Sequence, residues 1–421
     1  MNITGQKSHK ALQKKVEMNS SHHFYAFQAT IRLFSQAMIQ SLPLAKIRRS
    51  IVSIIGFLQA QIAGSIMPYK FISYIKDVKN NNIKAARKLI DRLREALWMN
   101  FIDITDIDEL AQQTKAEKLE LFEDYSIDNS ETQHCRYVEM AKHLESNTYN
   151  YNSASVFSIT LEDTLYYSSK RHILLTKTFK VIAESLGLVT KRSLQRYIKE
   201  INLIKLFLNK HEYISGYSCL LRNFRNQNYY HCLIDNLPKI YHLNQEPYRS
   251  VPEINLLISG ELSSAEEFFL AKILPSNVKI KFVQEDCFYH LEKCIFVQPL
   301  TRWMSGYLPR PYLEHFAEKA LPQRARNRKN RIFISRKSAS KRHIKNESEL
   351  MSCLSPYGFK SYSLENLTVE EQAELFYDAE YIIGVHGAGM SNILFAEQAN
   401  VLEIFPGSEI IPHYYFLSKS L

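Results

Sequence analysis

The sequence predicts an α/β protein, and three features support this prediction. From about residue 156 to residue 300, strand-like apolar runs alternate with helical ones, as in a sheet whose strands are joined by crossover helices. Residues 331–405 repeat the alternation in the order β-α-β-α-β-α-β. A turn with almost no side chains, HGAG at residues 386–389, follows the third strand of that series.

Composition and cysteine spacing set the broad class. A length of 421 residues with 45% hydrophobic residues is enough for a large core and for two or three domains. The six cysteines are scattered, with no CxxC pair and no Cys/His spacing of a tetrahedral metal site. Reduced thiols in a cytoplasmic protein are therefore expected. The first residues lack the apolar core and cleavage site of a secretory signal, so no export is predicted.

The positive charge of the chain is concentrated in one stretch. Of the 53 Lys and Arg residues, ten lie between Arg324 and Lys345, where there is no Asp or Glu, and the remainder matches the 43 acidic residues. A local charge of this kind indicates a specific anionic ligand or surface more than a uniformly basic protein.

Residues 1–150 are expected to form a mostly helical extension. The clearest amphipathic helix spans Asn81 to Trp98, and a more polar helical stretch is expected at residues 108–126. The polar segment at residues 149–155 marks the expected boundary with the α/β part.

The segment from Ile51 to Met67 is the best candidate for membrane contact, because it is apolar and follows three basic residues. Polar residues interrupt it, and its apolar residues follow helical spacing. A packed amphipathic helix fits best. Peripheral contact of residues 46–67 with the inner face of a membrane is the alternative, and a true span fits least.

The last third of the chain gives the clearest element predictions. Asn346 is expected to cap a helix that begins at Glu347 and stops near Gly358. Thr368 and Glu371 have the spacing of a capping box and open the next helix. The strands are expected at residues 331–336, 359–363, 381–385 and 401–405.

The glycine turn occupies the place where open α/β sheets bind ligands, beyond the carboxyl end of a strand. Gly387 and Gly389 would let the backbone approach a ligand closely, and the amides of residues 390–392 at the following helix start would point at negative charge. The spacing from Gly384 onward is GxxGxG, which is not the dinucleotide pattern GxGxxG. A P-loop and the GxSxG motif of serine hydrolases are also absent from the sequence.

Four segments in a fixed order resemble glycosyltransferase family 61, which includes bacterial capsular-polysaccharide enzymes (DUF563). They are NYYHCLIDNLPKIYHL, ISRKSASKRHIKNESEL, EEQAELFYDAEYIIGVHGAGMSNILF and VLEIFP. The resemblance covers roughly residues 155–415. It implies a GT-B architecture, with two Rossmann-like domains facing a cleft: an acceptor-side domain at residues 151–310 and a donor domain at residues 311–421.

The resemblance also implies an activity. The expected reaction is inverting transfer of a sugar from a nucleotide sugar, most simply a UDP-sugar, to a glycan or other hydroxyl acceptor in surface or capsular polysaccharide synthesis. The sequence has no DxD motif in an appropriate loop, so metal-independent transfer without a cofactor is expected. Cationic side chains and helix N-termini would then stabilise the leaving diphosphate.

Arg336 and Arg342 resemble the arginines of the family and are the candidates for the diphosphate, because a guanidinium fork matches phosphate oxygens. The lysines of the same stretch fit a solvated loop better. His386 would lie beside the diphosphate or satisfy a backbone carbonyl in a tight loop. Gly387, Ala388 and Gly389 would form the turn around the donor.

Three further residues complete the candidate donor site. Ser391 and Asn392 would contact the donor or only cap the helix. Glu403 lies in the last strand and would accept hydrogen bonds from the ribose hydroxyls, or else needs another buried partner.

His231 and Asp235 are the candidates for the catalytic base. They are four residues apart, which places them on one face if the segment is helical as far as Pro238. A carboxylate beside an imidazole raises its basicity toward a hydroxyl proton. A structural hydrogen bond is the alternative for the pair, and the sequence does not decide between the two residues.

Two other functions compete with the transferase. The first is a protein that binds nucleic acid or another anionic polymer through residues 324–345, although the sequence shows no recognition module and no nucleic-acid partner is expected. The second is a non-catalytic family member acting as a scaffold. The chain also ends soon after Pro412, so a long C-terminal helix that crosses back between the domains is not expected.

Overall fold

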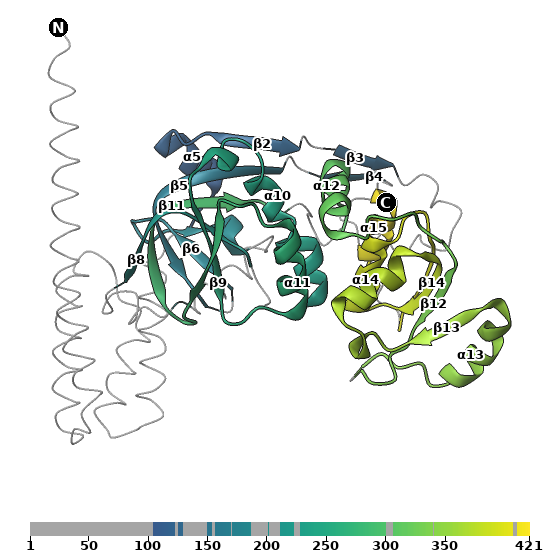
Figure 1. Ribbon diagram of the computed structural model, residues 1–421. Coiled ribbons are helices and arrows are strands. Elements are labelled where there is room, and N and C mark those ends of the chain that lie inside the picture. The colour runs from purple at the N-terminus through teal and green to yellow at the C-terminus, as the bar shows by residue number, and fades with distance from the viewer. Residues whose placement is uncertain are drawn as a thin grey trace, which may run out of the picture. The chain divides into compact units, whose positions relative to one another are not determined.

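The computed structural model describes residues 104–122, 125–128, 150–153, 156–169, 171–186, 201, 211–222, 228–299, 306–339, 341–406 and 411–421. The helix expected at residues 81–98 and the candidate membrane segment at residues 46–67 lie outside these ranges. The chain divides into two units, and the unit made of Ile104–Leu194 and Glu212–Leu421 contains every element described below (Figure 1).

The larger sheet has nine strands in the order β1-β7-β6-β5-β11-β8-β9-β10, with β2 added beside β5. Strands β11, β8, β9 and β10 are parallel to one another, whereas β5 runs antiparallel to β11, β6 and β2. The expected parallel sheet is therefore one end of a mixed sheet. The bounds are β1 Ile104–Thr105, β2 Lys118–Phe122, β5 Val156–Tyr167, β6 Ile173–Leu175, β7 Val181–Ile182, β8 Glu212–Leu220, β9 Ile254–Ser259, β10 Val278–Val283 and β11 Phe288–Val297.

The helices of this half follow the strands that the sequence predicted. After β8 the chain forms α9 (Tyr229–His231), the π-helical turn η3 (Cys232–Asn236) and α10 (Lys239–Leu243). After β9 it forms α11, whose capping box joins Ser263 and Glu266. The remaining bounds are α5 Ile107–Thr114, η2 Ala183–Leu186, η4 Tyr248–Ser250, α11 Ser264–Ile273 and α12 Arg310–Ala320.

The smaller sheet has the order β13-β12-β14-β15, and all its pairings are parallel. It confirms the predicted order of strands and helical segments, although the third segment is the 3-10 helix η7 and Asn346 makes no side-chain capping bond at the start of α13. Gly358 ends the first helical segment in the left-handed conformation at φ 82°, and Thr368 and Glu371 form the capping box. The bounds are β12 Asn330–Ile334, α13 Glu347–Leu354, η5 Ser355–Tyr357, β13 Phe359–Tyr362, η6 Leu364–Asn366, α14 Val369–Tyr377, β14 Ala379–Val385, η7 Ala388–Phe395, β15 Asn400–Ile404 and α15 His413–Ser420.

The expected helical extension to residue 150 needs correction within the described residues. Only α5 is helical there, because Lys115 takes a left-handed conformation at φ 58° and ends the helix. The next segment, Lys118–Phe122, becomes β2 and pairs with β5, so part of the larger sheet precedes the expected boundary. The polar segment at residues 149–155, where the boundary was expected, contains β4 (Asn150–Ser153), which pairs with β3 (Tyr125–Asp128).

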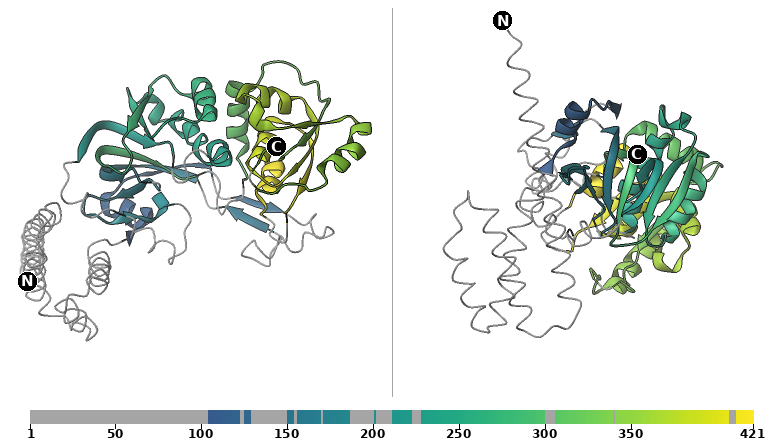
Figure 2. Two further views of the ribbon diagram at one scale, coloured as in Figure 1. Left: turned by 90° about the horizontal axis from the view of Figure 1, so that it is seen from below. Right: turned by 90° about the vertical axis from the view of Figure 1, so that its left-hand side faces the viewer.

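Aromatic side chains join elements of the two sheets in one hydrophobic core. The ring of Phe269 on α11 lies 5.4 Å from that of Phe316 on α12 and 5.5 Å from that of Phe395 in η7. Buried residues of β9 and β14 belong to the same cluster, among them Leu256 and Ile382. Helix α15 packs against η7, and Figure 2 shows the C-terminus among the elements of the smaller sheet.

Two findings on membrane helices and cysteines apply to the described ranges only. No helix there has the length and apolar character needed to cross a bilayer. Five cysteines are described, and all five carry free thiols; they are Cys219, Cys232, Cys287, Cys294 and Cys353.

Candidate active site

The carboxyl ends of β12 and β14 define the candidate site. The chain leaves β12 toward β13 on one side and later returns to β14 on the other, so the strand order reverses between these two neighbours. In open α/β sheets such a reversal leaves a crevice beyond the strand ends. Arg336 follows β12, and the HGAG turn follows β14, so both lie at this crevice.

Arg336 packs directly on the glycine turn. A Cβ added to Gly387 would lie 3.2 Å from the Cζ of Arg336 and closer still to its Nη1. The Nε and Nη2 groups of Arg336 donate to the carbonyl oxygen of Lys341 at 3.3 and 3.2 Å. Glycine at position 387 therefore leaves the space that the guanidinium occupies.

Arg342 reaches the same turn from the loop after β12. Its Nη1 donates to the carbonyl oxygen of His386 at 2.9 Å. Burial lowers the pKa of the Arg336 guanidinium below its ordinary value, and the charge of Arg342 lowers it further, while Glu365 and Tyr414 act in the opposite direction. Two cations that disfavour each other's charge form a site that an anion would stabilise.

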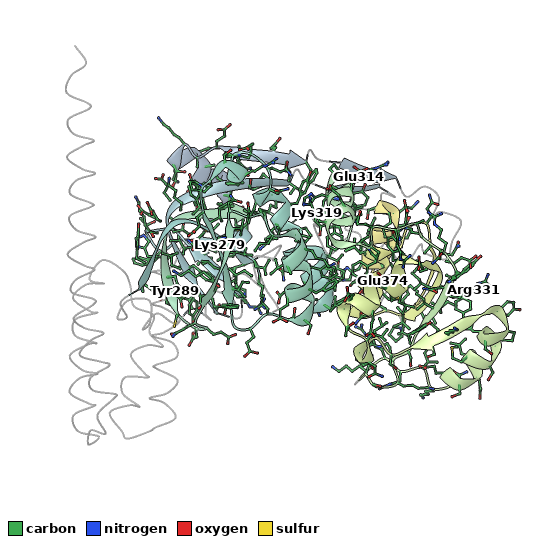
Figure 3. All side chains as sticks on the ribbon, in the orientation of Figure 1. Lys279, Tyr289, Glu314, Lys319, Arg331 and Glu374 are labelled. Atoms are coloured by element: carbon green, nitrogen blue, oxygen red, sulfur yellow. The ribbon has the colours of Figure 1, made fainter. Side chains whose placement is uncertain are left out.

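The other arginines of the basic stretch are committed to carboxylates. Arg324 binds Asp378 at 2.9 Å and Glu374 at 2.5 Å. Arg331 binds Glu380 at 3.1 Å, and Figure 3 labels Arg331 together with Glu374. Arg326 and Arg328 both bind Glu397. Among the described residues, Arg336 and Arg342 form no such ion pair, which distinguishes them from these four neighbours.

His386 pairs with Glu403. This gives Glu403 the buried partner that the sequence offered as the alternative to ribose binding. Its Nδ1 lies 2.5 Å from Oε1 of Glu403, and the histidine is 7% exposed. Burial raises the pKa of the Glu403 carboxyl above its ordinary value, and the hydrogen bond from His386 opposes that rise. The imidazole also stacks on Phe405 with ring centroids 5.5 Å apart.

The glycine turn is closed by its own helix and by α15. The carbonyl oxygen of Gly387 accepts from the amide of Met390 at 2.9 Å and from the phenol of Tyr414 at 2.7 Å. The amide of Met390 is used in this way, so it does not point at a ligand. The amides that could face a ligand at the start of η7 are those of Ala388 and Gly389.

Ser391 and Asn392 are both fully buried behind the turn. The Asn392 amide accepts from the Tyr229 hydroxyl at 2.6 Å and donates to Gln372 at 3.0 Å and to the Gly389 carbonyl at 3.1 Å. The Ser391 hydroxyl lies beside the phenol of Tyr414. The structure thus uses the Asn392 side chain to join elements around the turn.

His231 and Asp235 form the pair that their spacing predicted. The Nδ1 of His231 lies 2.5 Å from Oδ2 of Asp235, and both side chains are 12% exposed. The segment is helical throughout, with a π-helical bond from the amide of Leu237 to the carbonyl of Cys232 at 3.0 Å. A carboxylate at Nδ1 fixes the tautomer of the imidazole.

A chain of rings connects the two histidine–carboxylate pairs. Tyr230 meets His231 edge-on at 5.4 Å and stacks on His413 at 4.7 Å. His413 lies 5.9 Å from His386. Sequence reasoning missed His413 and Tyr414, because they approach the turn only through the tertiary packing of α15.

A cleft of about 550 Å³ adjoins the turn on the side of α14. Tyr229, the first turn of α11 and the segment from η6 into the first turn of α14 line it. Among the described residues, no three His, Cys, Asp or Glu side chains are grouped so that they could hold a metal ion.

The comparison with family models gives the site its context. Residues 229–402 match the model described as Glycosyltransferase 61. The matched segment includes His231, Asp235, Arg336, Arg342 and the HGAG turn, and ends just before Glu403. A search of curated proteins finds no match.

The mixed α/β fold and this match support a glycosyltransferase. The match assigns residues 229–402 to glycosyltransferase family 61, the family that the motifs indicated.

Proposed function

We propose that this chain is an inverting, nucleotide-sugar-dependent transferase whose donor diphosphate binds between Arg336, Arg342 and the HGAG turn. The single observation that supports this most is the convergence of both guanidinium groups on one glycine turn at the crevice of the smaller sheet. Neither arginine is neutralised by a carboxylate of the described residues, unlike Arg324, Arg326, Arg328 and Arg331. A diphosphate would supply the missing negative charge.

The leaving group is stabilised by charges already in position. As the bond between the anomeric carbon and the diphosphate oxygen breaks, negative charge grows on that oxygen. The two guanidinium groups and the first amides of η7 would face it without having to reorganise. The same residues bind the diphosphate more tightly once it has left, so release of the nucleotide is part of the cycle.

The proton of the acceptor is assigned to His231. The acceptor hydroxyl forms a new bond to the anomeric carbon from the face opposite the diphosphate, which inverts the configuration there, and its proton passes to the imidazole. Asp235 at Nδ1 would stabilise the imidazolium that results. His386 has an equivalent carboxylate in Glu403, so it is the alternative base.

A GT-B arrangement agrees with several features of the structure. Both sheets contribute to one core, and the 550 Å³ cleft is lined from both halves. The short helix α15 contacts Tyr230 of the other half through His413, which gives the chain a connection that the sequence did not lead us to expect. The family resemblance supports four further proposals. They are use of a UDP-sugar, metal independence, a role in surface or capsular polysaccharide synthesis, and a cytoplasmic location with peripheral membrane contact.

Nucleotide binding tests the donor site. A thermal-shift panel of UDP-, GDP-, CMP- and dTDP-sugars, run with and without a chelator, identifies the donor class and any metal requirement. Arg336→Ala should then abolish binding of the matching nucleoside diphosphate while the protein stays folded. Arg310→Ala is the matched control, because that side chain is 85% exposed on α12 and pairs only with Glu314 among the contacts described. Unchanged binding in Arg336→Ala would remove the basis of the proposal.

Turnover tests the base. His231→Ala should keep donor affinity and lose transfer, and Asp235→Asn should lower transfer with a changed pH profile. Normal turnover of His231→Ala, with loss in His386→Ala, would move the role to His386.

Binding to an anionic polymer is the weaker candidate. It requires free positive charge along residues 324–345, yet Arg324, Arg326, Arg328 and Arg331 each bind a carboxylate. Affinity for a polyanion that falls steeply with salt and ignores nucleotide sugars would favour it over the transferase.

A further inference from the structure

The cleft beside α14 has the chemistry of a site for a neutral group. The residues that line it include two carboxylates, Glu365 and Glu370, and among the described lining residues there is no Lys, Arg or His. Hydroxyl groups, the amide of Gln372, aliphatic side chains and the ring of Phe268 complete the lining. A volume of about 550 Å³ falls within the range of about 300–1,000 Å³ that is common for small-molecule sites.

The two helix starts at the cleft are not anion sites. Ser263 caps α11 and Thr368 caps α14, each in a reciprocal capping box with a glutamate of its own helix. Each capping box uses the amides of the N-cap and N3 residues, and Glu365 and Glu370 add repulsion of a phosphate group. Phosphate is disfavoured here, whereas groups that donate hydrogen bonds are favoured.

The cleft adjoins the proposed diphosphate position. A Cβ on Gly389 would lie 2.9 Å from Cδ1 of Leu364, so Leu364 touches the glycine turn while it also lines the cleft. The carboxylate of Glu365 is close enough to Arg336 to act on its charge. A group in the cleft would thus be within covalent reach of a diphosphate held by Arg336.

The acceptor hydroxyl is expected on another side of helix α9. Tyr229 lines the cleft, but His231, two residues later, does not. Two residues correspond to a rotation of about 200° on a helix, so the two side chains leave α9 on nearly opposite faces. The donor diphosphate carries a sugar and a nucleoside. The sugar reacts with the acceptor hydroxyl near His231, so the nucleoside is the group that lies on the other side.

We propose that this cleft binds the nucleoside of the donor, with Glu365 accepting hydrogen bonds from the ribose hydroxyls and Phe268 contacting the base. The inference rests on the proposed transferase function and replaces Glu403, which is paired with His386, as the ribose-binding acid. The nucleoside then spans elements of both halves, while the diphosphate contacts only the smaller sheet's loops and η7.

The experiment compares two probes by calorimetry on the full chain: the nucleoside diphosphate selected by the thermal-shift panel, and inorganic pyrophosphate. Glu365→Gln should weaken nucleoside diphosphate binding by about 10-fold or more, the usual loss for hydrogen bonds to a charged group. It should leave pyrophosphate affinity equal or higher, because a negative charge near Arg336 is removed. Ser264→Trp, at an exposed position in the first turn of α11, should block the nucleoside diphosphate and spare pyrophosphate. Glu253→Gln, an exposed carboxylate outside the cleft, is the control.

The outcomes separate this inference from the proposed function. Equal losses of both probes in Glu365→Gln would mean that Glu365 acts through Arg336, and would overturn the nucleoside site. Wild-type affinity for the nucleoside diphosphate in both cleft variants would assign the cleft to another ligand, such as the acceptor, and also overturn it. Neither result touches the diphosphate site, which fails only if Arg336→Ala binds both probes normally.

Discussion

Replacing Gly387 with alanine should separate ligand binding from folding. The backbone at Gly387 is extended, with φ 171° and ψ 166°, a conformation that alanine adopts without strain. The added Cβ would instead meet the guanidinium of Arg336, 3.2 Å from Cζ and closer to Nη1. The substitution therefore acts on the position of one cationic side chain.

The size of the effect follows from these contacts. The guanidinium must move by about 1 Å to restore ordinary contact distances, and a long side chain can do so through small rotations. We expect the free energy of unfolding to change by less than about 1 kcal/mol. Moving the fork off the diphosphate removes charge-assisted hydrogen bonds worth about 1.5–3 kcal/mol, which corresponds to a 10- to 150-fold loss of affinity.

The assay is calorimetry with the nucleoside diphosphate, paired with urea denaturation of the same samples. Arg310→Ala is again the binding control, because that side chain is exposed on α12 and pairs with Glu314. Gly384→Ala is the folding control, because its Cβ would lie 2.6 Å from Sδ of Met390 and 3.1 Å from Cδ1 of Ile334 in the core. That overpacking should cost about 1–3 kcal/mol.

Two results would refute the reasoning. Wild-type affinity in Gly387→Ala would show that the position of Arg336 does not matter for the diphosphate. A stability loss as large as that of Gly384→Ala would show that the turn cannot adapt by moving the guanidinium.

Three further predictions concern buried charges. Arg222→Met should lower the free energy of unfolding, measured in urea, by about 3–5 kcal/mol, because Glu266 would be left as an unpaired buried carboxylate. The double variant with Glu266→Met should recover part of the loss. Unchanged stability of Arg222→Met would contradict this prediction. Burial lowers the pKa of Lys239 from 10.5 to about 8, so the unfolded state binds more protons than the folded state between these two pH values. The free energy of unfolding should therefore rise by about 3 kcal/mol as the pH increases from 8 to 10.5. Urea titrations of Lys239→Met at each pH should lack that rise. Burial raises the pKa of Glu403 above 4.5, so the stability contributed by its neutral form is present below pH 4.5 and is lost as the pH rises through the folded-state pKa. Thermal melts of Glu403→Gln across this pH range should not show that loss. A pH profile identical to that of the wild type would disprove the assignment.

The sequence by itself determined the elements of the last third and the meeting of Arg336 with the glycine turn. Strand runs, caps and turn residues are local signals, and each acts within a few residues. The convergence also follows from the sequence, because the carboxyl ends of parallel strands share one edge of a sheet. The pairing of His231 with Asp235 needed only the helical period, since a separation of four residues places both on one face.

Only the tertiary structure decided which residues complete the site. Glu403 meets His386 across 17 residues, Tyr414 meets the Gly387 carbonyl across 27, and Tyr229 meets Asn392 across 163. The strand β2 was likewise decided by its pairing with β5 and not by its own composition. Such contacts depend on how distant elements pack around a shared core, and no local pattern of residues encodes that packing.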